Sequence, residues 1–201
     1  MKKRLAILLS GRGSNFVAIA DAISSGKLDA EIAVVISDKA HAPGIAIAKE
    51  RGLQAVVLPS KGLGREEYDR RLADVIDQNR IDLICLAGFM RLLSPQFVQR
   101  FPQKILNIHP SLLPAFPGLD VQRQAIDHGV KSSGCTVHFV DEGLDSGPII
   151  QQAVVPVLDH DTAETLAARI LVEEHRIYAE AIGLVLSGHW RLDERRVVKT
   201  A

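Results

Sequence analysis

Two polar side chains near the middle of the chain could carry acid–base chemistry together. Asn107 and His109 stand two residues apart at the end of an apolar run, so an extended strand would point both side chains to the same side. An amide can hydrogen-bond developing negative charge, and an imidazole can accept or donate a proton near neutral pH. The pair is typical of a site that stabilises an oxyanion and moves a proton, although a single histidine more often only hydrogen-bonds a loop carbonyl.

An acidic turn at residues 141–148 could add a carboxylate to this pair. Its sequence is Asp-Glu-Gly-Leu-Asp-Ser-Gly-Pro, and because these residue types favour turns, turn formation alone explains much of it. A carboxylate beside His109 would fix the tautomer of the imidazole and raise its basicity. His138 precedes the turn and could contribute, but a histidine inside a strand is more often a core or edge residue.

A glycine-containing loop at residues 10–15 is a third candidate site. It reads Ser-Gly-Arg-Gly-Ser-Asn between an apolar run and a helical pattern, where backbone N–H groups and the helix dipole can bind a phosphate. Phe16 stands where a dinucleotide fingerprint has its third glycine, and the Gly-Lys-Ser/Thr of a P-loop is missing, so a single phosphate suits the loop better. A tight turn capped by Ser14 or Asn15 explains the motif equally well.

Three further segments carry weaker signals. The charged stretch 65–71 is most simply the solvated face of a helix, on which Glu66 and Asp69 offer ion pairs. Glutamates 173–174 could turn inward to bind sugar hydroxyls, but exposure is the default for carboxylates. Residues 87–93 combine a glycine with bulky apolar side chains and could wall a flat aromatic ligand, although core packing explains them as easily.

Apolar runs alternate with amphipathic segments through the first half of the chain. The pattern predicts strands and intervening helices, with strands at 5–9, 31–36, 54–58, 83–87 and 105–108 and helices at 15–24, 42–51, 65–78 and 95–100. Nearly continuous apolar strands separated by helices predict a parallel sheet covered on both faces, the doubly wound Rossmann-like α/β arrangement. Ligands bind such sheets at the carboxyl ends of the strands, where the 10–15 loop and His109 fall.

The pattern changes after Pro110. A proline-rich loop leads to a predicted short helix at 121–128 and to strands at 136–140 and 149–157. The loop between these strands is too short for a parallel crossover, so we expect a mixed or antiparallel C-terminal part of the sheet. A long helix is predicted to start at Thr162, with Asp161 or Thr162 as N-cap, and the charged tail 191–201 has room for one edge strand.

The composition indicates an ordinary globular protein. Among 201 residues, 24 Lys and Arg balance 24 Asp and Glu, and 47% are hydrophobic. Zero net charge disfavours binding of nucleic acid or anionic membrane through the global field, and no apolar stretch approaches the roughly 20 residues of a membrane span. Cys85 and Cys135 belong to neither a metal motif nor a disulfide framework. These features predict a cytoplasmic protein.

Four motifs taken together resemble the glycinamide ribonucleotide formyltransferase family. They are the 10–15 loop, Ala-Gly-Phe-Met-Arg at 87–91, Asn-Ile-His-Pro-Ser-Leu-Leu-Pro at 107–114 and Leu-Asp-Ser-Gly-Pro at 144–148. The last two are specific to enzymes that handle the formyl group of 10-formyltetrahydrofolate, and the glycine loop narrows the resemblance to the purine enzyme. The match spans nearly the whole chain in order and spacing.

The resemblance implies a catalytic set of Asn107, His109 and Asp145. In such an enzyme of de novo purine biosynthesis, the amine of glycinamide ribonucleotide attacks the formyl carbon of 10-formyltetrahydrofolate. Asn107 and protonated His109 would stabilise the oxyanion, while Asp145 would orient His109 and help move the proton towards the departing N10. The folate is a co-substrate, and neither a metal nor a covalent enzyme intermediate is expected.

The resemblance also implies substrate contacts. The ribonucleotide would be bound by Gly13, Ser14, Asn15, Pro110 and Glu174, with the loop backbone on the phosphate and Glu174 on the ribose. The folate would be bound by Arg65, Leu86, Met90, Arg91, Leu92, Leu93, Asn107, Val140, Asp141 and Asp145. Within this group Arg65 would lie near the glutamate tail, because a guanidinium pairs well with carboxylates.

The chain departs from the family pattern after the Pro-Gly at 117–118. Family members often continue with Leu-His-x-His, whereas this sequence has Leu119, Asp120, Val121 and Gln122. Neither missing histidine belongs to the catalytic set, so the expected activity stands. Gln122 keeps a hydrogen-bonding side chain without the charge, and substrate affinity or pH profile could differ.

Three alternatives use the same fold or site. A 10-formyltetrahydrofolate hydrolase (deformylase) would replace the amine by water, but family deformylases usually carry an N-terminal regulatory domain and lack the glycine loop. The relative that formylates initiator methionyl-tRNA bears an RNA-binding domain, for which 201 neutral residues leave no room. A non-catalytic nucleotide sensor is disfavoured by the intact Asn107, His109 and Asp145.

The predicted organisation is one formyltransferase domain over residues 1–201. Residues 1–109 would form its nucleotide- and phosphate-binding half, and residues 110–201 its folate-binding and catalytic-loop half. We expect small-molecule substrates as the only ligands, with no nucleic acid, membrane or metal. A homodimer is compatible with the sequence, and the 141–146 loop, with Gly143, is a candidate for motion.

Overall fold

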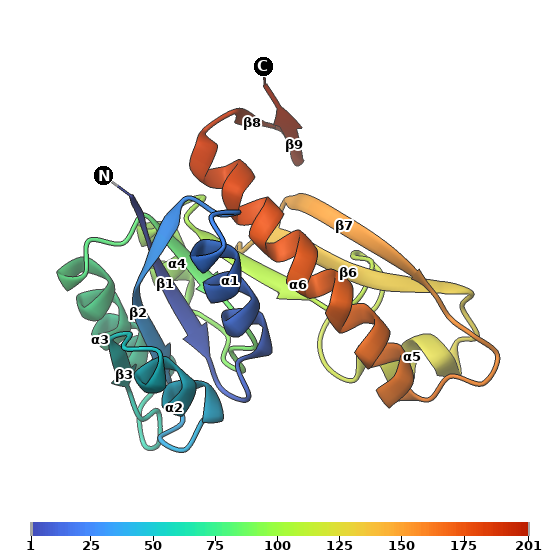
Figure 1. The fold of residues 1–201 in the computed structure, drawn as a ribbon, viewed down its shortest axis with the longest axis horizontal. Coiled ribbons are helices and arrows are strands. Elements are labelled where there is room, and N and C mark those ends of the chain that lie inside the picture. Colours follow the sequence, from blue (N-terminus) through green and yellow to red (C-terminus); the bar gives the residue numbers. More distant parts are fainter. Residues whose placement is uncertain (1, 201) are drawn as a thin grey trace. The chain divides into compact units, whose positions relative to one another are not determined.

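The computed structural model of the protein describes residues 2–200, and its backbone divides into two compact units that meet in the sequence between Asn107 and Ile108. Figure 1 shows the helices and strands of both units. Because β5 runs from Ile105 to His109, its last two residues are assigned to the second unit. The prediction of a single domain with halves 1–109 and 110–201 stays a prediction, and its two terminal residues lie outside the described part.

The first unit is a parallel α/β sheet. Its strands are β1 (Lys3–Leu9), β2 (Ala30–Ser37), β3 (Ala55–Val57), β4 (Leu83–Leu86) and β5 (Ile105–His109). They pair in parallel in the order β3-β2-β1-β4-β5. The connecting helices are α1 (Ser14–Ser24), α2 (Pro43–Glu50), α3 (Arg65–Gln78) and α4 (Pro95–Arg100). The predicted doubly wound fold is confirmed here.

The central strand of this unit explains why its sequence lacks alternation. All side chains of β1 from Leu5 to Leu9 are fully buried, so both faces of the strand are covered and each position selects an apolar residue. Parallel pairing brings the carboxyl ends of β1, β2, β3, β4 and β5 to one edge of the sheet. The loops that follow these strands are therefore placed together by the topology.

One expected surface residue of the first unit is buried. Asp69 on α3 is 4% exposed, and its Oδ2 accepts a hydrogen bond of 2.5 Å from the backbone N–H of Ser94. The prediction of Asp69 as part of a solvated face was therefore wrong, because the carboxylate satisfies the backbone at the start of α4. Within this helix, exposed ion pairs join Glu67 to Arg70 and Arg71.

The second unit combines an antiparallel pair of strands with a long helix. Its elements are α5 (Val121–Asp127), β6 (Ser132–Phe139), β7 (Ile149–Pro156), α6 (Ala163–Ser187), β8 (Trp190–Asp193) and β9 (Arg196–Lys199). β6 and β7 pair antiparallel, as the short connecting loop predicted. The tail was expected to hold one edge strand; it forms the hairpin β8–β9, and β9 also pairs in parallel with β7 at Ile149 and Arg196.

Helix α6 is fixed at its first turn and along its apolar stripe. Thr162 is the N-cap and forms a capping box with Thr165, as the sequence predicted for Thr162. Asp161 is held by two hydrogen bonds from Arg169 at 2.7 and 2.9 Å. The helix packs against β6 and β7 through buried residues that include Leu166, Ile170, Ile177 and Tyr178. In the described part of the chain no helix is long and apolar enough to cross a membrane.

Substitution of Gly134 tests the packing of β6 against β7. A Cβ at this position would lie 1.9 Å from the carbonyl oxygen of Ala153, and the backbone cannot yield without breaking the strand pair. We expect Gly134→Ala to lower the free energy of unfolding by about 3 kcal/mol or more. The matched control is Gly64→Ala, whose Cβ would meet no atom within 4 Å. Urea unfolding checks both, and equal stability of the two variants would contradict the described pairing.

Candidate active site

His109 ends β5 and lies between two hydrogen-bond acceptors. The side chain is 6% exposed. Its Nε2 is 2.9 Å from the carbonyl oxygen of Phe116, and its Nδ1 is 3.4 Å from Oδ2 of Asp145. A carbonyl oxygen can only accept, so Nε2 carries a hydrogen in this arrangement.

The doubly protonated imidazole satisfies both neighbours of His109 at once. In that form Nε2–H points to Phe116 and Nδ1–H to the carboxylate of Asp145, whereas a neutral ring has only one N–H. Both interpretations of His109 that the sequence allowed are seen in the structure. Its Nε2 bonds a loop carbonyl, and its Nδ1 faces a carboxylate. An oxyanion can bond Nε2 only when the Phe116 carbonyl moves away.

Asp145 reaches His109 from an unusual backbone conformation. Its φ is 49°, in the left-handed region that non-glycine residues rarely adopt. Oδ2 also accepts a hydrogen bond of 2.9 Å from the backbone N–H of Gly118. Two residues later, a Cβ on Gly147 would lie 1.8 Å from the carbonyl oxygen of Phe139, so only glycine fits there. The Asp-x-Gly spacing therefore has a steric cause.

His138 is a second buried histidine close to Asp145. As predicted for a core position, the side chain is 2% exposed, but its Nε2 lies 3.8 Å from Oδ1 of Asp145. Nδ1 donates a hydrogen bond of 2.8 Å to the carbonyl of Phe139. Burial lowers the pKa of His138, which favours the neutral ring. A neutral histidine and His109 thus approach the two oxygens of one carboxylate.

The loop after β5 contributes Phe116, which the sequence did not single out, and Ser111, whose role within the 107–114 motif was not foreseen. The hydroxyl of the buried Ser111 donates to the carbonyls of Ala115 at 2.7 Å and of Phe116 at 3.0 Å. This holds Phe116, the partner of His109, in place. Pro110 lies between His109 and Ser111 in the sequence. Asn107 stands two residues before His109 on β5, so strand alternation places both side chains on the same side. The serine after His-Pro was a usable signal, since its hydroxyl favours turns.

The glycine loop of the first unit begins α1. Gly13 is the N-cap of the helix with φ 79°, and no side chain caps it. The expected caps Ser14 and Asn15 are the first helical residues instead, so the cap prediction was wrong. Gly13 also packs closely: its Cβ would lie 3.0 Å from Cα of Gly44. Gly13 has no side chain to cap these first N–H groups, and a helix start of this kind can bind an anion.

Ser10 joins the loops that follow three strands of the first unit. Its hydroxyl donates to Oδ1 of the buried Asp38 at 2.6 Å and accepts from the backbone N–H of Met90 at 2.9 Å. Its own N–H bonds the carbonyl of Gly88 at 3.0 Å. These contacts fix the loops after β1, β2 and β4 to one another. Ser10 was part of the predicted motif, but this role was not foreseen.

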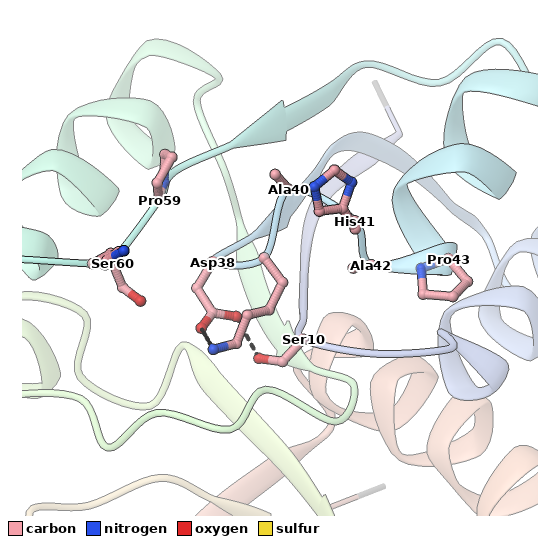
Figure 2. Close-up of a pocket in the computed structure, with 10 residues that line it drawn as sticks. Ser10, Asp38, Ala40, His41, Ala42, Pro43, Pro59 and Ser60 are labelled. Atoms are coloured by element: carbon pink, nitrogen blue, oxygen red, sulfur yellow. Dashed lines mark hydrogen bonds and ion pairs between the residues drawn. The ribbon is translucent and has the colours of Figure 1, made fainter.

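Ser10 and Asp38 also line a cavity of about 600 Å³ within the first unit (Figure 2). The cavity lies at the carboxyl ends of β1, β2 and β3, and its other polar lining residues are Lys39, His41, Ser60 and Lys61. The carboxylate of Asp38 is already engaged by Ser10 and by Lys39, whose Nζ is 3.7 Å away. None of the residues predicted to contact substrate lines this cavity.

The predicted folate segment after β4 forms a cluster with α3. The guanidinium of Arg91 lies 4.3 Å from the centroid of the Tyr68 ring, and Tyr68 stacks with Phe89 at 6.4 Å. Burial raises the pKa of Tyr68 far above its usual range. Met90 and Leu92, at 66% and 55% exposed, present large apolar side chains to the surface. Such exposure is typical of a binding surface rather than of core packing.

The other predicted contacts are distributed over both units. Arg65 is the exposed first residue of α3, while Leu86 at the end of β4 is buried. Leu93 is half-buried, as are Val140 and Asp141 after β6. The carboxylate-bearing Glu174 on α6 is only 8% exposed, so exposure, the default from composition, was wrong for it. Substrate contacts of all these residues stay predictions.

Two remaining expectations concern metals and the replaced histidines. Among residues 2–200 no group of three His, Cys, Asp or Glu is placed to hold a metal ion. Both cysteines are free and buried. Asp120 is the N-cap of α5 with φ 54° and makes no side-chain cap, and Gln122 is the second residue of that helix. Asp120 and Gln122 therefore lie at a helix start close in sequence to Gly118, the partner of Asp145.

Comparison with known families identifies the class of this protein. The family model described as formyl transferase matches residues 3–182. The match covers both units, the glycine loop, Asn107, His109 and Asp145. The chain therefore belongs to the formyl transferase family, and the resemblance drawn from its four motifs is confirmed.

Individual relatives narrow this class. A phosphoribosylglycinamide formyltransferase of Escherichia coli K12 is 42% identical over 191 residues, covering 94% of this chain and 90% of the relative. A trifunctional purine biosynthetic protein adenosine-3 of Drosophila pseudoobscura pseudoobscura is 49% identical over 193 residues. The chain spans only 14% of the length of that relative.

Solved structures agree with these relatives. The crystal structure of glycinamide ribonucleotide transformylase 1 from Symbiobacterium toebii matches with a TM-score of 0.97 and 50% identity, covering all of this chain and 95% of that one. A formyltetrahydrofolate deformylase from Pseudomonas syringae also matches, with a TM-score of 0.93 but 27% identity, and this chain covers 67% of it. Backbone similarity alone therefore does not separate transfer from hydrolysis, whereas sequence identity favours the transferases.

The lowered pKa of His138 predicts a loss of stability in acid. Below the ordinary value of 6.5 the unfolded chain binds a proton that the folded chain resists, so stability falls as the pH falls, by at most about 1.4 kcal/mol per pH unit for one group. His138→Asn can still donate to the Phe139 carbonyl but cannot titrate. We expect its unfolding free energy to decrease less than that of wild type between pH 7.5 and 5.5.

Urea unfolding at pH 8.0, 7.5, 6.5 and 5.5 measures this dependence. At pH 8.0 His138 is neutral in both folded and unfolded chains, so the difference there isolates the packing effect of the substitution. His175, whose pKa burial also lowers, contributes equally to both proteins. Identical pH slopes for wild type and His138→Asn would show that His138 does not resist protonation.

Proposed function

We propose that the protein transfers the formyl group of 10-formyltetrahydrofolate to the amine of glycinamide ribonucleotide, giving formylglycinamide ribonucleotide and tetrahydrofolate in de novo purine biosynthesis. The single observation that carries this proposal is the buried His109–Asp145 pair, with Asn107 on the same strand and the same side. The named relatives and the uncapped glycine loop support the ribonucleotide as acceptor.

The mechanism assigns a separate role to each side chain. The amine nitrogen attacks the formyl carbon, and the carbonyl oxygen of the formyl group becomes an oxyanion. The amide N–H of Asn107 and the protonated ring of His109 stabilise that charge. Asp145 holds the imidazolium by its carboxylate and helps carry the proton lost by the amine to the departing N10 of the folate. No covalent bond to the protein is required.

The acceptor is the point at which the main alternative differs. Hydrolysis of 10-formyltetrahydrofolate would use the same three residues with water as nucleophile. The glycine loop favours transfer, because a phosphate bound by the N–H groups of Ser14 and Asn15 at an uncapped helix start would select a phosphorylated acceptor. The ribose contact of Glu174 and the folate contacts of Arg65, Leu86 and residues 90–93 belong to the same proposal.

Two properties of the whole protein are also proposed. We place it in the cytoplasm, because the buried free thiols of Cys85 and Cys135 are compatible with a reducing compartment. The sequence is compatible with a homodimer, and sedimentation equilibrium would measure the oligomeric state. Its partners would be the two small-molecule substrates, without nucleic acid or membrane.

The catalytic role of Asp145 is tested with Asp145→Asn. The amide cannot compensate the imidazolium of His109 or accept its proton, so we expect kcat for formyl transfer to fall by roughly 100-fold or more. The measurement is absorbance of the released folate with and without glycinamide ribonucleotide. Asp159→Asn, at an exposed carboxylate paired with Lys131, is the matched control and should keep wild-type activity.

The assay also separates the alternatives. Ribonucleotide-dependent turnover lost in Asp145→Asn supports the transferase, and equal turnover without the ribonucleotide assigns the protein as a hydrolase. Absence of turnover in a folded wild type that binds the ribonucleotide would indicate a sensor. Full activity of Asp145→Asn would remove the carboxylate from the mechanism.

The phosphate role of the glycine loop is tested with Gly13→Ala. The added methyl meets Cα of Gly44 and the left-handed φ is strained, which displaces the N–H groups that would bind the phosphate. We expect KM for the ribonucleotide to rise roughly tenfold with little change in KM for the folate. Gly26→Ala has the same left-handed strain but no neighbour within 4 Å, and should leave both KM values unchanged. A wild-type KM in Gly13→Ala would exclude this loop as the phosphate site.

A further inference from the structure

The C-terminal hairpin β8–β9 contacts both ends of the loop that carries Asp145. The hairpin follows α6 (Figure 1) and lies outside residues 3–182, which the family model matches. The loop, residues 141–148, leaves β6 after Phe139 and enters β7 at Ile149. Three contacts hold the hairpin here, one to the loop itself and two to the strand residues that flank it, all within the second unit.

The first contact lies where the loop begins. The ring of Trp190 on β8 packs against Phe139 with centroids 5.0 Å apart. The indole Nε1 donates a hydrogen bond of 3.0 Å to the carbonyl of Val185, so the ring is held by α6 while it covers Phe139. Phe139 also bonds the next segment, because its N–H donates to the carbonyl of Pro148 at 2.9 Å. The contact between Trp190 and Phe139 thus stabilises the segment from which the loop begins.

The second and third contacts lie where the loop ends. β9 pairs in parallel with β7 at Ile149 and Arg196. At the turn of the hairpin, the guanidinium of Arg195 donates a hydrogen bond through Nη2 to the backbone carbonyl of Ser146. Ser146 is the neighbour of Asp145, and its hydroxyl donates to Oδ1 of Asp141 at 2.6 Å. The bond from Arg195 therefore reaches the residue next to the carboxylate that faces His109.

Arg195 differs from the other arginines of the hairpin. Arg196 donates to Oδ2 of Asp193 at 2.7 Å, and Arg191 lies 3.9 Å from Oδ1 of the same residue. Among the described residues, Arg195 makes no such ion pair with a carboxylate. The bond from Arg195 to a carbonyl restrains the backbone of the loop. Asp145 requires such a restraint, because its left-handed φ of 49° persists only where its surroundings enforce it.

We propose that the β8–β9 hairpin is a brace for the catalytic loop and that Arg195 is a positioning residue. By holding the carbonyl of Ser146, Arg195 keeps the 141–146 loop in the conformation that presents Asp145 to His109 and to the N–H of Gly118. Val140 and Asp141, predicted folate contacts, lie on the same segment. Loss of the brace therefore weakens use of the formyl donor without weakening the ribonucleotide site at the glycine loop.

The test compares Arg195→Ala with Arg191→Ala and Arg195→Lys. In Arg195→Ala we expect kcat/KM for the formyl donor to fall roughly three- to tenfold, with KM for the ribonucleotide unchanged and Tm within about 2 °C of wild type. Arg191→Ala, an exposed arginine of the same hairpin, should behave as wild type. Arg195→Lys retains one donor for the carbonyl and should recover part of the loss.

Two readouts separate positioning from a merely structural role. Hydrogen exchange of amides 141–147 in the substrate-free protein should quicken in Arg195→Ala and not in Arg191→Ala. In a double-mutant cycle, Arg195→Ala should change kcat by less than about twofold in the Asp145→Asn background, because its effect passes through Asp145. The kinetic measurements rest on the proposed function, whereas the exchange measurement does not.

Several outcomes would overturn the inference. They are wild-type kinetics and exchange in Arg195→Ala, equal losses in Arg191→Ala, or a kinetic loss that only accompanies a lowered Tm. If wild type lacks formyl transfer altogether, the proposed function fails, and the exchange experiment still decides whether the hairpin braces the loop.

Discussion

The arrangement of this protein depends on a carboxylate held beside a buried imidazole. Asp145 approaches His109 from a left-handed backbone conformation, which costs free energy for a residue other than glycine. The Gly118 N–H on one carboxylate oxygen, the sterically required Gly147 and the contacts at the base of the loop together maintain that conformation. The carboxylate in turn faces Nδ1 of a ring whose other nitrogen already bonds the Phe116 carbonyl.

The two histidines around Asp145 show how burial divides chemical roles. His138 is deeply buried, and loss of solvation lowers its pKa. The neutral ring is therefore favoured, and a neutral His138 does not form an ion pair with the Asp145 carboxylate. His109 has an acceptor on each nitrogen, the Phe116 carbonyl and the Asp145 carboxylate. A site with two cationic histidines beside one carboxylate would be less stable, because like charges repel at this distance.

The first unit prepares its loops by a different means. A parallel sheet brings the ends of its strands to one edge, and Ser10 then ties three of the following loops together through hydrogen bonds. Gly13 packs tightly against α2, since an added Cβ would lie 3.0 Å from Cα of Gly44, and a Cβ on Gly44 would lie 2.7 Å from the Leu9 side chain. The helix start of α1 is thereby left without a side-chain cap, which suits an anion more than a tight turn alone would.

The sequence by itself determined the fold class, because unbroken apolar strands such as β1 can be buried only in a sheet covered on both faces, and the short 141–148 loop permits only antiparallel pairing. It also indicated the family through motifs whose residues are close in the chain.

Tertiary structure decided what sequence neighbours cannot reveal. Asp69 is buried by the start of α4, Glu174 is buried on α6, and Gly13 rather than Ser14 caps α1. The hairpin at the C-terminus contacts the Asp145 loop across about 50 residues of chain. Such contacts depend on long-range packing, and charge or turn propensity in the local sequence does not encode them.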